Sequence, residues 1–111
     1  MKPAIISSLL ILISTTLCAQ TRFEVTGDTL YFDIRAKEPG YEFTRQLEHY
    51  DVRLLSEYIF EHPEIRKLNI TGPGGDMDAA RKIAEVLITH NIDTVAYGKC
   101  YSACTLIFLG G

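Results

Sequence analysis

The stretch LNITGPGGDMDAARKIAEVLITHNIDTVAYGKCYSACTLIFLGG, residues 68–111, decides the fold that we expect for this chain. It starts within a short apolar, β-branched run, Lys67 to Thr71, which is typical of a buried strand and which Gly72-Pro73-Gly74-Gly75 ends. Residues 76–90 place apolar side chains on one side and charged ones on the other, which predicts an amphipathic helix. Residues 92–98 are rich in strand-forming residues and predict a second strand.

An apolar segment, Ala103 to Leu109, follows Ser102. Its period does not separate a buried helix from a buried strand. We favour a helix, because a strand has just ended and Gly110-Gly111 provides a stop. Such a helix would expose apolar faces unless more chain packs over it. We therefore expect these residues to be the N-terminal part of a longer domain.

The residues before this stretch predict a hairpin and a helix. Arg22 to Arg35 alternates apolar and polar residues around a Thr26-Gly27-Asp28 turn, which indicates two antiparallel strands. Glu42 to Phe60 predicts a helix. Its apolar stripe consists of Phe43, Leu47, Tyr50, Leu54 and Tyr58. The alternation of strands and helices along the chain implies an α/β fold with a mostly parallel sheet.

Residues 1–19 have the three parts of a secretory signal peptide: a positive start, an uncharged apolar segment and a small residue at the end. We expect cleavage between Ala19 and Gln20, which leaves a single domain, residues 20–111. Two other interpretations stay open, a lipid on Cys18 and an uncleaved N-terminal membrane anchor. We prefer cleavage, because Leu17 is large for the residue before a lipidated cysteine. The expected location is the periplasm or the extracellular space.

The charge of the domain makes two classes of partner poor candidates. Removal of Lys2 with the leader leaves 10 of the 11 Lys and Arg residues against 14 Asp and Glu residues. The domain is therefore acidic and has no basic run, so nucleic acid and anionic lipid surfaces are poor candidates for partners.

The glycine-rich turn at 72–75 has three interpretations. It could be a phosphate or dinucleotide cradle, but Pro73 removes an amide and no Lys-Ser or Lys-Thr pair follows. It could be a structural turn only. It could also be an oxyanion site, whose backbone N–H groups would stabilise developing negative charge. We expect this chain to bind no cofactor.

The oxyanion interpretation needs a nucleophile, and Ser102 stands at the turn from the second strand into the last helix. A serine there presents its hydroxyl at the tip of the sheet, and the amide of Ala103 would be a further donor. The alternative is a simple N-cap. His49, His62 and His90 are most simply surface residues.

Cys100 and Cys104 bracket Ser102. Helical i, i+4 spacing places Cα atoms about 6 Å apart, which is within disulfide range. We hypothesise a disulfide that fixes the serine turn, with two free buried thiols as the alternative. We expect no metal site, because no further ligands accompany this pair.

The turn Gly72-Pro73-Gly74-Gly75, the helix after it, the Thr94-Val95 strand and Ser102-Ala103 resemble the Clp protease proteolytic subunit and its crotonase-fold relatives. The Cys-x-Ser-Ala-Cys form is closer to an exported branch of that superfamily. The resemblance covers residues 23–111, and its specific part is 70–111. Two departures are Thr71-Gly72, where the family usually has Asn-Ser, and Ala103, where it has Met.

This resemblance implies stacked strand-strand-helix units and a serine-type peptidase. Ser102 would be the nucleophile, and the amides of Gly75 and Ala103 would hold the oxyanion. The family's catalytic His and Asp follow the serine, so we expect them beyond residue 111. The implied substrate is a peptide or small ester, a homo-oligomer is among the expectations, and no ATPase partner is expected outside the cytoplasm. The alternative function is a non-catalytic envelope module for binding or assembly.

Overall fold

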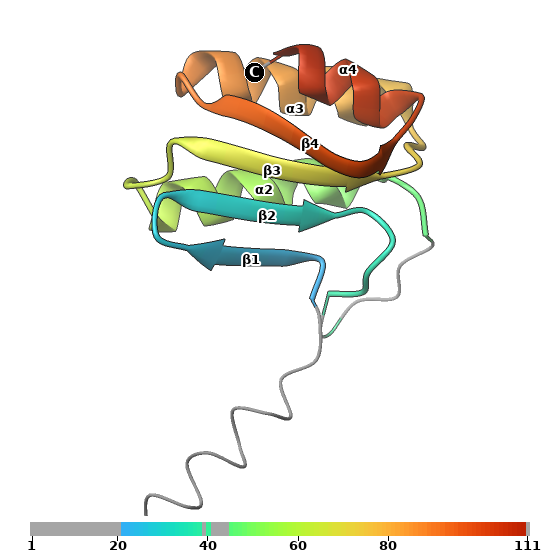
Figure 1. Cartoon of the computed structure of the whole chain (residues 1–111). Coiled ribbons are helices and arrows are strands. Elements are labelled where there is room, and N and C mark those ends of the chain that lie inside the picture. Colours follow the sequence, from blue (N-terminus) through green and yellow to red (C-terminus); the bar gives the residue numbers. More distant parts are fainter. Residues whose placement is uncertain (1–20, 39, 41–44, 111) are drawn as a thin grey trace, which may run out of the picture.

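The computed structural model describes residues 21–38, 40 and 45–110. The expected signal peptide, Cys18 and the cleavage pair Ala19 and Gln20 lie outside the described residues. The described chain is an α/β fold with a four-stranded sheet and three helices, as the alternating pattern predicted (Figure 1).

The sheet is mixed, and its strands lie side by side in chain order (Figure 1). β1 and β2 form the predicted antiparallel hairpin. β2 pairs with β3, and β3 with β4, in parallel. The strands are β1 (Phe23–Thr26), β2 (Thr29–Asp33), β3 (Lys67–Gly72) and β4 (Asp93–Cys100).

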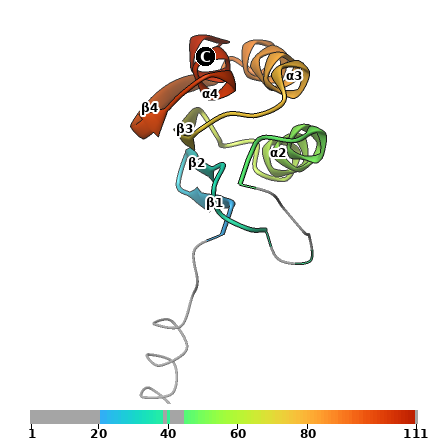
Figure 2. The same cartoon turned by 90° about the vertical axis from the view of Figure 1, so that its right-hand side faces the viewer.

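The helices are α2 (His49–Glu61), α3 (Met77–Thr89) and α4 (Ala103–Gly110). α2 and α3 lie on one face of the sheet, as Figure 2 shows. α4 packs against α3 and β4, and it buries Ala103, Cys104 and Ile107. The helix that we favoured for the final apolar segment is therefore confirmed.

The helix predicted from Glu42 begins later, at His49. Glu48 is its N-cap: the Glu48 side chain accepts from the backbone of Asp51, and the Glu48 amide donates to the Asp51 carboxylate at 2.9 Å. This capping box stops the helix from extending backwards. Leu47 is buried, but as part of an isolated parallel bridge with Gly75 and not as part of the helical stripe.

A buried ion pair between Arg22 and Asp51 fixes the start of α2. The Arg22 Nε lies 2.7 Å from Asp51 Oδ1, and both side chains are fully buried. The guanidinium also donates to the carbonyl oxygens of Ile34, Ala36 and Gln46. One side chain thus joins the residue before β1, the segment after β2 and the segment before α2.

Candidate active site

Ser102 occupies a sharp turn between β4 and α4. Its φ is 51°, in the left-handed region that residues other than glycine rarely adopt. The turn is held on both sides, because the Tyr101 amide donates to the Gly72 carbonyl at 3.1 Å and the Thr105 amide donates to the Ser102 carbonyl at 2.9 Å. Ser102 is exposed. A strained, exposed serine between a strand and a helix has the geometry of a nucleophile elbow.

Gly74 packs directly against this elbow. A Cβ added at Gly74 would lie 2.7 Å from the Ala103 nitrogen, 2.9 Å from the Tyr101 oxygen and 3.1 Å from the Ser102 Cβ. Only glycine fits in so small a space, and the φ of 117° at Gly74 also requires it. The glycine-rich turn and the serine, 28 residues apart in sequence, therefore meet at one end of the sheet.

The expected oxyanion amides are those of Gly75 and Ala103. Leu47 bonds to the residues on either side of Gly75: its amide donates to the Gly74 carbonyl at 2.6 Å, and its carbonyl accepts from the Asp76 amide at 2.9 Å. In a parallel bridge of this kind, the N–H of the middle residue points away from the partner segment. Within residues 21–38, 40 and 45–110, neither the Gly75 nor the Ala103 amide has a hydrogen-bond partner.

Cys100 and Cys104 lie at disulfide distance, with their Cα atoms 5.3 Å apart. The bridge spans the elbow, and Cys104 is fully buried in the core. The structure therefore has the pairing that we hypothesised, in place of two free thiols.

No histidine contacts Ser102 among the described residues. His49 Nε2 lies 3.3 Å from Asp76 Oδ1, His62 pairs with Glu64, and His90 contacts the Val86 carbonyl. The Ser102 hydroxyl likewise has no hydrogen-bond partner in the described chain. The described residues therefore place no general base within hydrogen-bond reach of Ser102.

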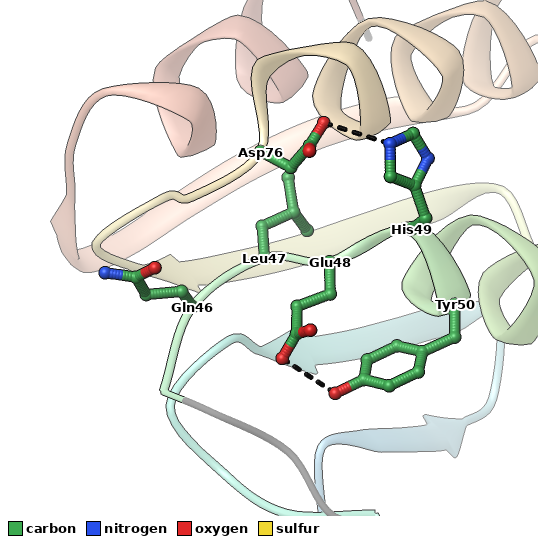
Figure 3. A pocket seen from close by; sticks show the side chains of 6 residues that line it. All are labelled: Gln46, Leu47, Glu48, His49, Tyr50 and Asp76. Atoms are coloured by element: carbon green, nitrogen blue, oxygen red, sulfur yellow. Dashed lines mark hydrogen bonds and ion pairs between the residues drawn. The ribbon is translucent and has the colours of Figure 1, made fainter.

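An open pocket of about 540 Å³ lies next to the glycine-rich turn (Figure 3). His49 points at Asp76, and the Tyr50 hydroxyl donates to Glu48 at 2.7 Å. Burial and the Glu48 carboxylate raise the pKa of Tyr50 to about 12. The pocket is lined by Gln46, Leu47, Glu48, His49, Tyr50 and Asp76.

Sequence reasoning missed this pocket, because its residues come from two helix starts that are far apart in the chain. His49, Asp76 and Asp78 could offer three metal-ligating atoms within 4.8 Å of one another. However, Lys82 and Arg81 already contact Asp78, and the hydrogen bond from Lys82 lowers the pKa of that carboxyl. The positive end of the α3 dipole also opposes a cation there.

No protein-family model, no curated protein and no solved structure matches this chain. In the described part of the chain, no helix has both the length and the apolar character that a membrane span requires.

Proposed function

We propose that this chain carries the nucleophile and the oxyanion-binding amides of an exported serine hydrolase with a Clp-protease-like, crotonase-type fold. The observation that supports it best is the left-handed backbone of Ser102, in a turn whose neighbouring backbone atoms, from Tyr101 and Ala103, pack against Gly74. A strained residue of this kind persists only where its surroundings hold it, and such residues gather at functional sites.

In the proposed reaction, the Ser102 oxygen attacks the carbonyl carbon of a peptide or small ester. The carbonyl π electrons move onto oxygen, and the Gly75 and Ala103 amides donate to that oxyanion. Collapse expels the amine or alcohol and leaves an acyl-serine, which water then hydrolyses. The N-terminal end of α4 adds a favourable dipole at the nucleophile.

A base must accept the proton of Ser102, since an unassisted hydroxyl is a weak nucleophile. We expect a His and an orienting Asp after residue 111. We also propose that further strand-strand-helix units stack on the four-stranded sheet, and that the domain is exported and loses its leader. A disulfide is typical of that compartment.

The second candidate is a non-catalytic envelope module that keeps the fold for binding or assembly. The absence of a base next to Ser102 among the described residues favours it.

Fluorophosphonate labelling of the full-length protein, purified from its natural envelope, separates the two candidates. The hydrolase predicts labelling that Ser102→Ala abolishes. Ser56→Ala is the matched control, because Ser56 is the one other serine within residues 20–111 and its hydroxyl donates within α2 to the Val52 carbonyl. If the folded protein takes up no label, the module is the better account.

A further inference from the structure

The face of the sheet opposite α2 and α3 carries a row of partly exposed aromatic and apolar side chains. Leu30 and Phe32 of β2 are fully buried on the helix side, so Tyr31 between them faces the other way. In register, Tyr31 pairs with Asn69 of β3, which pairs with Val95 of β4. Tyr31 is 37% exposed and Tyr97 is 41% exposed.

A pocket of about 210 Å³ lies on this face. It is lined by Thr21, Glu24, Tyr31, Asp33 and Tyr97. Two of its residues are aromatic and two are carboxylates, and none is basic. Glu24 lies directly across from Tyr31 in the hairpin.

The carboxylates of this pocket have no cationic partner in the described part of the chain. Asp33 accepts a hydrogen bond from the Arg35 amide at 3.0 Å, which is a neutral donor, and Glu24 forms no ion pair there. The pocket beside His49 differs, since His49 contacts Asp76 of its lining and also the nearby Asp78, which Lys82 contacts as well.

Two further observations indicate a negative potential at this face. The pKa of Tyr97 is raised mainly by burial, and the charges of Asp33, Tyr31 and Glu24 raise it further. The Asn69 side-chain oxygen is buried below the same face without a hydrogen-bond partner among the described residues. An anionic ligand is therefore excluded by charge, and a neutral apolar one would desolvate two carboxylates without compensation.

We propose that this pocket binds the cationic side chain of a lysine or arginine from a peptide partner. The two tyrosine rings would contact the cation and its alkyl stem, and Glu24 and Asp33 would supply the opposite charge. The volume suits one such side chain. No residue of the Ser102 site contributes to this pocket, so the proposal is independent of the hydrolase.

The test is an NMR titration of the ¹⁵N-labelled full-length protein with the peptide acetyl-Gly-Lys-Gly-amide. The lysine peptide, and its arginine analogue, should shift the amide signals of Glu24, Tyr31 and Asp33 saturably. The norleucine analogue, which keeps the alkyl stem without the charge, should not. Asp33→Asn, which can still accept from the Arg35 amide, should weaken binding about fivefold, as should Tyr97→Leu.

Asp28→Asn is the matched control, because Asp28 is an exposed carboxylate in the hairpin turn outside the pocket. It should leave the affinity for the lysine peptide unchanged. Equal binding of the norleucine peptide would overturn the proposal in favour of a plain apolar contact face. So would an Asp28→Asn effect as large as that of Asp33→Asn, or no saturable shift with any of the peptides.

Discussion

Gly74→Ala tests the contact between the glycine-rich turn and the serine elbow. The added Cβ would lie 2.7 Å from the Ala103 nitrogen and 2.9 Å from the Tyr101 oxygen, which are backbone atoms and cannot rotate away. Overpacking of this kind costs about 1–3 kcal/mol. The φ of 117° adds about 1–3 kcal/mol for a residue other than glycine. We expect the free energy of unfolding to fall by about 2–6 kcal/mol. A loss of that size is a large part of the total stability of many small domains.

Gly27→Ala is the control for this prediction. Gly27 also has a positive φ, 62°, but no atom lies within 4 Å of the position of its Cβ. Its substitution should therefore cost only the left-handed strain, about 1–2 kcal/mol. Urea unfolding of the full-length variants, followed by circular dichroism, measures both. If Gly74→Ala costs no more than Gly27→Ala, the inference that Gly74 packs tightly against the serine elbow is wrong.

Three further predictions concern the framework of the site. Asp51→Ala removes the carboxylate that balances the charge of the buried Arg22 guanidinium and should cost about 3–5 kcal/mol. Replacing both residues, Arg22→Met with Asp51→Leu, should cost less, and equal losses in urea would contradict this. Under oxidising conditions, Cys104→Ser should lower the free energy of unfolding by about 2 kcal/mol relative to the parent protein. When the parent protein is reduced, its free energy of unfolding should equal that of the variant. The pKa of Tyr50 is about 12, above its ordinary 10.0, so the folded state keeps that proton longer. Stability should therefore fall between about pH 10 and 12, and a Tyr50→Phe variant with an unchanged fall in Tm would refute this.

The hairpin and the elements after α2 could be predicted from the sequence, because their signals are local. Alternation identified the hairpin, and the 3.6-residue period identified α3. The left-handed Asn91 lies just after α3, close to the end that the sequence indicated. The position of Ser102 between a strand and a helix followed from these boundaries alone.

The start of α2 and the surroundings of Gly75 could not be predicted in this way. The spacing of Phe43, Leu47 and Tyr50 continues a helical stripe, but tertiary contacts override it: Leu47 bonds to the glycine-rich turn. Glu48 and Asp51 have the spacing of a capping box, a local signal that would have placed the helix start correctly.

The Arg22–Asp51 pair joins residues 29 positions apart, and no local pattern marks such a contact. The same holds for His49 and Asp76, which meet only because α2 and α3 start at the same end of the sheet. These pairings depend on the packed arrangement of elements and not on the periodicity of any one of them.

Mass-spectrometric mapping of the fluorophosphonate adduct on the full-length protein tests the central claim most directly. The proposed mechanism predicts one adduct, on the peptide that contains Ser102, and no adduct on the peptide that contains Ser56. An adduct on any other residue, or an unmodified Ser102 in a protein that hydrolyses peptides or esters, would contradict the assignment of Ser102 as the nucleophile.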